Sequence, residues 1–180
     1  MNKLILSISI AAILSGCNSI NNQTNKMEEK KGDTIKTVAI DDTTPKVIGI
    51  GGIFFFTDSP KGTKEWYNKN LGLKTDEYGS MFESRDINKP EQIDKLQWSP
   101  FKKGSEYFAP SKKEFMINYR VQNIERLVEK LKKNGVTVVD SIVAYGDYGK
   151  FVHIMDPEGN KIELWEPNYK HGSTDKGQVK

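Results

Sequence analysis

Cysteine is almost absent from this sequence, since Cys17 is the only one among 180 residues. A single cysteine excludes an internal disulfide, and no group of Cys and His has zinc-finger spacing. No run of about 18 apolar residues is present, which argues against a transmembrane helix in the mature protein. The 27 Lys and Arg nearly balance the 24 Asp and Glu, so we expect no nucleic-acid partner. The 36% hydrophobic content is typical of one globular domain with additional polar segments.

The first residues have the pattern of a bacterial export signal. A short basic start is followed by an apolar run at residues 4–14, which is too short to span a bilayer but suits a signal peptide. The run ends in Leu-Ser-Gly-Cys at residues 14–17, which resembles the lipobox of bacterial lipoproteins. The resemblance implies that residues 1–16 are removed and that Cys17 then carries lipid. An ordinary secretory signal with an incidental Cys17 is the alternative.

We therefore expect a lipid-anchored protein of the cell envelope that faces the periplasm or the exterior. The lipid chains of Cys17 would hold it on a bacterial membrane. Residues 17–45 are polar and lack apolar periodicity, which predicts a disordered tether. Residues 170–180 are similar and predict a disordered tail. The folded domain is expected at residues 46–169, a length that is sufficient for one core.

The first half of this domain begins with an apolar, aromatic strand at residues 47–57. Ser59 and Pro60 then predict the start of a helix, and Gly72 suits its end. We expect this helix to turn its large apolar residues toward the interior, namely Trp66, Tyr67 and Leu71. Two short strands are expected to follow, at residues 80–84 and 96–101.

The second half repeats this order of elements. A strand at residues 115–121 is followed by a helix after Asn123, in which Ile124, Leu127, Val128 and Leu131 form one apolar stripe. Three strands are expected after the helix, at residues 136–139, 150–155 and 161–166. Corresponding positions in the two halves are about 64 residues apart, so two βαβββ units fit the spacing, and the predicted class is α+β.

Three segments together resemble the vicinal oxygen chelate superfamily, which includes glyoxalase I, bleomycin-resistance proteins and extradiol dioxygenases. They are GGIFFFTDSPKGTKEWYNKNLGL at 51–73, MINYRVQNIERLVEKLKKNGV at 116–136 and MDPEGNKIELWEP at 155–167. The resemblance implies that the two units form a curved mixed sheet around a bowl-shaped cavity, with the helices on its outer face. In that superfamily the bowl is often completed by dimerisation, so a bowl within one chain and a bowl shared by the two subunits of a homodimer are both open.

Strand alternation predicts which side chains line the bowl. Side chains along a strand alternate between faces, and the more apolar set should meet the helices. For the first strand, the resemblance rather than polarity places Phe54 and Phe56 in the bowl. The predicted lining, which should bind a small-molecule ligand, comprises Phe54, Phe56, Met116, Asn118, Arg120, Phe151, His153, Glu163 and Trp165.

The pattern of metal ligands in the superfamily is incomplete in this chain. Metal-dependent members place His, Gln or Glu on the first and last strands of each unit, but the matching residues here include Gly52 and Met116. Glu163 matches one ligand position, and a further position lies ambiguously near Gln97 or Trp98. One or two ligands do not make a site for a divalent metal. We therefore expect no cofactor and keep a divalent metal as the disfavoured alternative, with Glu163 as a weak candidate ligand.

His153, Glu163 and Arg120 leave several interpretations open. His153 could join Glu163 as an unusual metal ligand, could form a general acid–base pair with it, or could be a hydrogen-bonded residue of the wall. Arg120 could bind a carboxylate, phosphate or sulfate of a ligand. It could equally reach solvent or pair with Glu163.

The leading hypothesis is a membrane-anchored domain that binds a small molecule, anionic if Arg120 contacts it, without the usual metal centre. The second is an enzyme: a metal-dependent lyase or dioxygenase with unusual ligands, or an isomerase that uses His153 and Glu163. The third is a protein-interaction module whose long tether lets it reach a partner.

Overall fold

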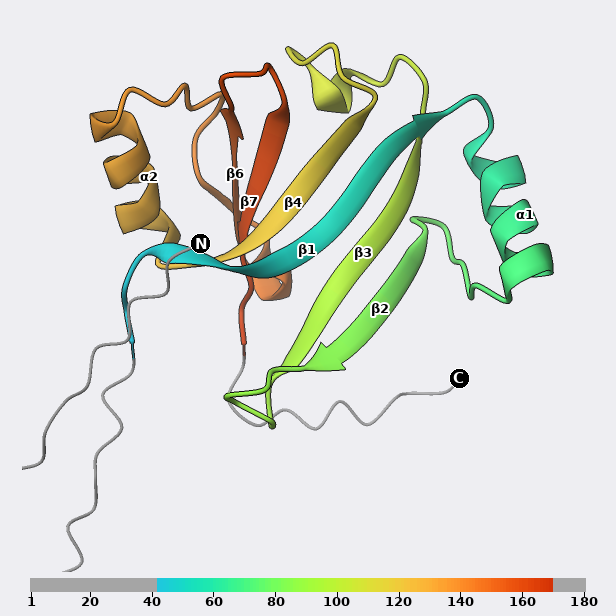
Figure 1. Ribbon diagram of the computed structural model, residues 1–180, viewed down its shortest axis with the longest axis horizontal. Coiled ribbons are helices and arrows are strands. Elements are labelled where there is room, and N and C mark those ends of the chain that lie inside the picture. The colour runs from blue at the N-terminus through green and yellow to red at the C-terminus, as the bar shows by residue number, and fades with distance from the viewer. Residues whose placement is uncertain (1–41, 170–180) are drawn as a thin grey trace, which may run out of the picture. The chain divides into compact units, whose positions relative to one another are not determined.

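The computed structural model describes residues 42–169, which form one seven-stranded mixed sheet with two helices (Figure 1). The order of the strands is β2-β3-β1-β4-β7-β6-β5, and the sheet is not closed into a barrel. The elements are β1 (Lys46–Thr57), α1 (Pro60–Leu71), β2 (Ser80–Arg85), β3 (Ile93–Lys102), β4 (Phe115–Gln122), α2 (Ile124–Lys133), β5 (Val143–Ala144), β6 (Lys150–Met155) and β7 (Lys161–Glu166). The short 3₁₀ helices η1 (Glu106–Phe108) and η2 (Gly146–Tyr148) lie in loops.

The predicted repeat is visible in the strand pairing. β1 pairs with β3 in parallel and β4 pairs with β7 in parallel, while β1 and β4 join the two halves as antiparallel neighbours. The halves differ in strand number, since two strands follow α1 and three follow α2. Residues 136–139 do not form the expected strand: Val138 makes only an isolated bridge to Ile154, and the short β5 lies at the sheet edge instead.

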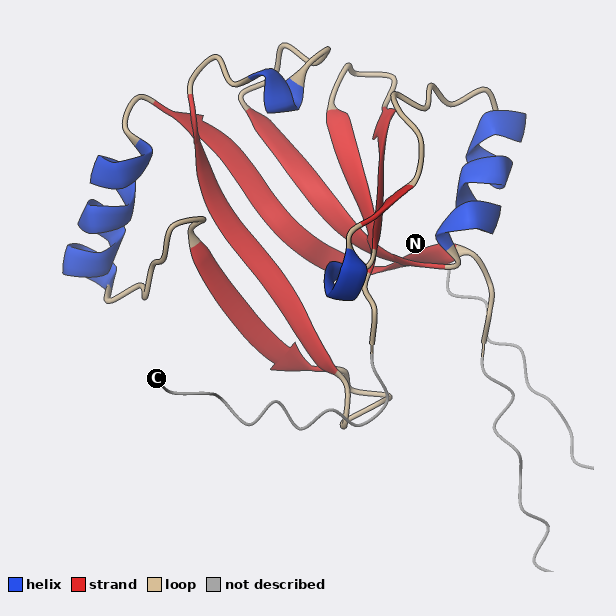
Figure 2. Ribbon diagram, turned by 180° about the vertical axis from the view of Figure 1, so that it is seen from behind, coloured by secondary structure: helices blue, strands red, loops and turns tan. Residues whose placement is uncertain are grey.

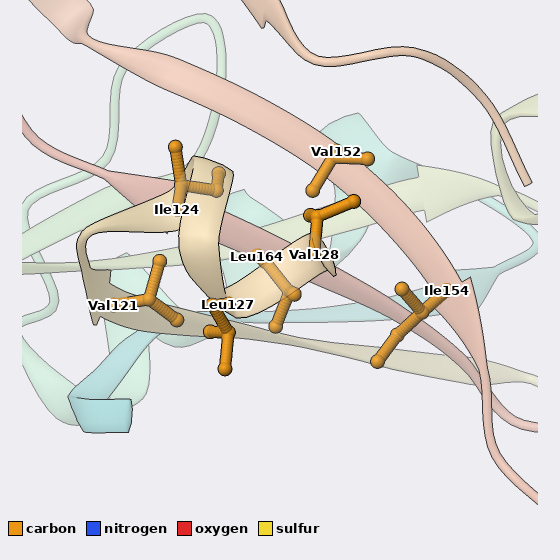
Figure 3. Packing of buried hydrophobic residues seen from close by; sticks show 7 residues of the cluster. All are labelled: Val121, Ile124, Leu127, Val128, Val152, Ile154 and Leu164. Atoms are coloured by element: carbon orange, nitrogen blue, oxygen red, sulfur yellow. The ribbon is translucent and has the colours of Figure 1, made fainter. Parts of the chain in front are cut away.

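Helix α2 is held by the apolar stripe that its sequence predicts. Ile124, Leu127 and Val128 are buried on one face of the helix. They pack with Val121 of β4, Val152 and Ile154 of β6, and Leu164 of β7 (Figure 3). Burying such side chains is the main driving force for docking a helix of this length, because a short helix is marginal alone.

Helix α1 has the predicted ends but not the predicted packing. The Ser59 hydroxyl accepts a hydrogen bond from Gly62 N at 3.1 Å, and Gly72 ends the helix with a φ of 68°. Tyr67 packs against Trp98 of β3 with ring centroids 4.7 Å apart. The expectation that Trp66 and Leu71 face inward is wrong, since they are 55% and 65% exposed. Three apolar residues at these positions cannot form a stripe wide enough to bury the helix.

The helices contact the same face of the sheet from opposite ends (Figures 1 and 2). Trp98 meets α1, and Leu164 meets α2, on the face that strand alternation assigns to the helices. The other, inner face carries Asn118, Glu163 and His153. The loop at residues 103–114, which contains η1, covers part of this inner face, because Phe108 stacks on Phe56 with centroids 4.2 Å apart.

Neither α1 nor α2, the two α-helices within residues 42–169, has the length and apolar character of a membrane-spanning segment. The predicted signal peptide, lipidated Cys17, most of the predicted tether and the predicted tail lie outside the described residues.

Candidate functional site

The strand register brings the polar residues of the inner face together. Asn118 of β4 is opposite Glu163 of β7, and Glu163 is opposite His153 of β6. Gly52 of β1 is opposite Asn118 on the other side of β4. Three of the residues that alternation predicted for the bowl therefore meet around a single carboxylate.

Glu163 is buried, with 3% of its surface exposed, and accepts hydrogen bonds from three protein donors. Its Oε1 accepts from Asn118 Nδ2 at 2.6 Å. Its Oε2 accepts from the Tyr107 hydroxyl and lies 2.9 Å from His153 Nε2. Burial acts to raise the pKa of Glu163, but the hydrogen bonds from His153, Tyr107 and Asn118 outweigh it, so the pKa is lowered. Glu163 is thus held as a carboxylate.

His153 lies between two carboxylates. Its Nδ1 is 2.6 Å from Asp140 Oδ2, and its backbone N–H donates to Asp140 Oδ1 at 2.8 Å. Burial acts to lower the pKa of His153, but the hydrogen bonds with Glu163 and Asp140 raise it overall. Because each ring nitrogen faces an oxygen that can only accept, the arrangement favours the doubly protonated imidazolium. The side chain of Asp140 is 44% exposed, so this network extends from solvent to the buried Glu163.

Tyr107 closes the network from the covering loop. Its hydroxyl donates to Glu163, and burial together with the Glu163 charge raises the pKa of Tyr107. The phenol therefore stays protonated at neutral pH. The Tyr107 ring also stacks on Phe101 with centroids 5.2 Å apart and meets the His153 ring edge-on at 5.7 Å.

Lys161 lies on the same side of β7 as Glu163, two residues earlier. It is only 6% exposed, and its Nζ donates to the Tyr107 carbonyl at 2.7 Å. Burial lowers the pKa of Lys161, although the charges of Asp140 and Glu163 act to raise it.

Arg120 is buried and pairs with Asp94. It neither reaches solvent nor pairs with Glu163. Its Nη2 lies 2.9 Å from Asp94 Oδ2, and its Nη1 donates to the Lys95 carbonyl at 3.0 Å. Asp94 also accepts from the Tyr169 hydroxyl at 2.9 Å. The guanidinium charge is therefore already neutralised inside the protein.

Glycines of β1 provide the space in which these side chains lie. A Cβ atom on Gly51 would be 2.2 Å from Asn118 Oδ1 and 2.6 Å from Trp165 Cε3. A Cβ atom on Gly49 would be 2.3 Å from Arg120 Nη2. Cβ atoms essentially never make non-bonded contacts this short, so a side chain at either position would force Asn118, Arg120 or the Trp165 ring to move.

The apolar part of the predicted wall is largely packed. Phe54 and Met116 are buried in a cluster with Phe108, and Phe56 and Phe101 pack against it. Of the nine predicted residues, only Phe56, Phe151 and Trp165 keep partial exposure. The rings of Phe151 and Trp165 are stacked, 8° from parallel with centroids 5.9 Å apart. The open part of the inner face therefore lies at β6 and β7.

Sequence reasoning missed Lys161, Tyr107 and Asp140. Strand alternation could have found Lys161, because residues 161, 163 and 165 share one face of β7. Tyr107 and Asp140 reach the site from loops, and no periodic signal in the sequence identifies such residues.

The donor set does not fit the metal centre that the superfamily implies. Gly52 and Met116 have no ligand atom suited to zinc, nickel or manganese, and both Glu163 oxygens already accept hydrogen bonds. Within the part of the chain that the structure describes, no group of three or more His, Cys, Asp and Glu side chains could hold a metal ion.

Comparisons with known proteins agree with this fold. The family model described as Glyoxalase/Bleomycin resistance protein/Dioxygenase superfamily matches residues 49–164. No curated protein matches the chain. Methylmalonyl-CoA epimerase from Streptomyces coelicolor is 13% identical with a TM-score of 0.52, covering 69% of this chain and 97% of that one. Methylmalonyl-CoA epimerase from Mycobacterium tuberculosis is 18% identical with a TM-score of 0.46, covering 68% and 89%. At 13% identity, the similarity to the Streptomyces coelicolor structure shows the fold alone.

Proposed function

Because the chain belongs to the glyoxalase/bleomycin resistance protein/dioxygenase superfamily, we propose that it is a ligand-binding member that works without a metal. A small molecule would bind on the inner face, and the lipid of Cys17 would hold the domain on a bacterial membrane. The observation that carries the proposal is the environment of Glu163. Glu163 matches a metal-ligand position of the superfamily. Its carboxylate accepts hydrogen bonds from Asn118, Tyr107 and His153, and these donors take the place of a metal cation.

The aromatic side chains at β6 and β7 support a ligand site there. Phe151 and Trp165 present a partly exposed stacked pair, and Tyr145 packs edge-on against Phe151 with centroids 5.7 Å apart. The indole N–H of Trp165 already donates to the Tyr148 carbonyl at 2.6 Å, so ring contacts are what this side chain offers. Partly exposed rings beside a few polar groups suit a small, flat, largely apolar ligand.

Arg120 gives little support for an anionic ligand, because Asp94 neutralises it. A neutral and an anionic probe of the same shape can separate these cases. We expect benzyl alcohol to bind at least as well as benzoate. Tighter binding of benzoate that is lost in Arg120→Ala would restore the anion-binding interpretation.

Ligand binding can be tested by thermal shift and by tryptophan fluorescence with a panel of small aromatic compounds. We expect compounds that raise the Tm of the wild-type domain to lose their effect in Trp165→Ala and Phe151→Ala. Trp66→Ala is the matched control, because Trp66 is exposed on α1 and should not contact the ligand. Binding that survives both inner-face substitutions, or the absence of any stabilising compound, would contradict the proposal.

The absence of a metal and the presence of a lipid need separate tests. After growth with zinc, nickel, iron and manganese, we expect purified protein to contain much less than one equivalent of any of them. Stoichiometric metal that Glu163→Gln removes would support the metal-dependent alternative. For the anchor, mass spectrometry should detect acyl chains on Cys17, and Cys17→Ser should release the protein from membranes.

Direct contact between His153 and Glu163 favours a second candidate function, proton transfer in an isomerase. The imidazole and the carboxylate are 2.9 Å apart and could exchange a proton with a bound substrate. This candidate predicts that a ligand found in the screen is converted by the wild type and is bound without conversion by Glu163→Gln.

A further inference from the structure

We propose that the solvent-facing side of helix α2 docks on the headgroups of an anionic phospholipid bilayer. The inference rests on the proposed function in one respect, because the lipid of Cys17 would bring this side of the helix to a membrane. Docking adds a second contact, which fixes how the domain stands on the bilayer. The residues of this basic face are Arg126, Glu129, Lys130, Lys133 and Asn134.

Unpaired positive charge is the first observation. From residue 126 to residue 133, α2 carries four cations and one acid, so this short segment has the same net charge of +3 as the whole chain. Among the residues that the structure describes, none forms an ion pair with Arg126, Lys130 or Lys133. Lys150, by contrast, pairs with Glu125 at the start of the helix, at 2.6 Å. The charge of the basic face is therefore available to an external anion.

The three unpaired cations lie on the side of α2 that faces away from the sheet. The opposite side, with Leu127 and Val128, is buried against the strands (Figure 3). Residues 126, 130 and 133 are four and three positions apart, so their side chains are neighbours on one helix face. The basic face lines an open hollow of about 500 Å³. A lipid phosphate there could accept hydrogen bonds from lysine and, in bidentate geometry, from Arg126.

The point at which the chain enters the domain is the second observation. Asn123, which precedes α2, donates from Nδ2 to the Thr43 carbonyl at 2.9 Å, and Gln122 donates from Nε2 to the Thr44 carbonyl at 2.8 Å. The segment that leads from Cys17 therefore joins the domain beside the first turn of α2. The 25 residues that separate Cys17 from the described domain reach roughly 90 Å at most. An anchored Cys17 thus keeps the basic face at a high local concentration of lipid, so docking can be weak.

Helix α1 lacks both of these features. Its Lys64 Nζ donates to the carbonyls of Asp76 and Glu77 at 2.8 and 2.6 Å, and Lys61 lies 3.8 Å from Glu65. The helix also lies at the other end of the sheet from α2 (Figure 2). Charge and chain entry therefore both favour α2 as the side that meets the membrane.

Docking through α2 would orient the inner face. Helix α2 packs on one face of the sheet, and Asn118, His153 and Glu163 lie on the other. With the basic face on the headgroups, the inner face is turned away from the bilayer, where a water-soluble ligand can reach it. Because the contact is electrostatic and exposed, salt should weaken it.

Reductive methylation with formaldehyde and dimethylamine–borane, which are both uncharged, tests the inference. The full-length protein, purified with its lipid, is reconstituted into vesicles of POPC alone or of POPC and POPG at 7:3, and peptide mass spectrometry measures the rate at each lysine. We expect POPG to slow Lys130 and Lys133 at least about fivefold, and to slow Lys69, which is exposed on α1, less than twofold. Sodium chloride at 0.5 M should remove the difference. Equal rates at Lys130 and Lys133 in both kinds of vesicle would overturn the inference.

A charge reversal separates local charge from net charge. Arg126→Glu should abolish most of the protection of Lys130 and Lys133 by POPG. Lys69→Glu is the matched control, because it changes the net charge by the same amount on α1, and it should leave that protection intact. Both side chains are exposed, so both variants should fold. Equal loss of protection in the two variants would show that net charge alone is responsible and would contradict docking through α2.

Mass spectrometry of Cys17 in the same samples distinguishes the two proposals. If Cys17 is acylated and POPG protects neither Lys130 nor Lys133, the docking inference is wrong and the anchor stands. If Cys17 carries no lipid, the anchor is wrong, and the same vesicles are added to the protein in solution. Protection by POPG would then support docking alone, and no protection would mean that both are wrong. Protection by soluble polyglutamate but not by POPG would assign the basic face to an acidic protein and would overturn the inference.

Discussion

Helix α2 buries Ile124, Leu127 and Val128 against the sheet, whereas helix α1 buries none of its residues. The two helices follow equivalent strands at a spacing of about 64 residues, yet only the second contributes to the main apolar core. The likeness of the two units is therefore one of topology. Packing energy is concentrated in the second half.

The polar chemistry follows the same division. Asn118, His153, Lys161 and Glu163 all come from β4, β6 and β7 of the second half. The first half contributes the glycines of β1, which leave room for these side chains. The comparison teaches that one unit of a repeat can provide the larger core and most of the buried polar groups, while glycines of the other unit leave room for them.

Truncation of one apolar side chain on each helix should give the largest contrast. We expect Ile124→Ala to lower the free energy of unfolding by about 2–5 kcal/mol, because it removes fully buried methylene and methyl groups and leaves a cavity. Leu71→Ala on α1 should change it by no more than about 0.5 kcal/mol, because Leu71 is exposed. Urea unfolding measures both. Equal losses would mean that α1 is as tightly packed as α2.

Glycine replacement should give an intermediate contrast. Gly51→Ala should destabilise the domain by about 1–3 kcal/mol, because the new Cβ would overlap Asn118 and Trp165. Gly62→Ala is the matched control within α1. Its Cβ would meet only the Ser59 side chain, at 3.1 Å, and alanine favours the helix, so a gain of up to about 1 kcal/mol is expected. Thermal unfolding distinguishes the two. If Gly51→Ala were as stable as wild type, a Cβ atom at residue 51 would fit beside Asn118 and Trp165.

The sequence predicted the architecture well where the periodicity of apolar residues was strong. The stripe that includes Ile124 and Leu127 predicted how α2 docks, and strand alternation placed Asn118 and Glu163 on one face. The prediction that Trp66 faces the interior was wrong, because a few large apolar residues on a short helix do not specify which face of the helix packs against the sheet. Helix ends were easier to predict, since Ser59 and Gly72 act through local backbone geometry.

The site was only partly predictable for a physical reason. Alternation identifies side chains of strands, so it found His153 and Glu163 but could not reveal that loops bring Asp140 and Tyr107 to them. The loop at residues 103–114 also packs Phe108 against Phe56, so much of the predicted open wall is a core. Long-range contacts of this kind depend on how loops pack against strands that are distant in the sequence, which no local pattern encodes.

Protonation of His153, which lies between Asp140 and Glu163, should give the smallest but most specific effect. The folded pKa of His153 lies above its ordinary value of 6.5. Its charge therefore adds stability below pH 6.5 that is lost as the pH rises through the folded pKa. We expect His153→Gln to cost about 1 kcal/mol near pH 6, the usual worth of a lost hydrogen bond, and less above the folded pKa. The series should stay above pH 4.5, because Glu163 must remain ionised.

Leu71→Ala, which removes no titratable group, should show a pH-independent difference from wild type in the same urea titrations. A cost of His153→Gln that grows with pH would show that His153 is neutral and that Glu163 is not held by an imidazolium.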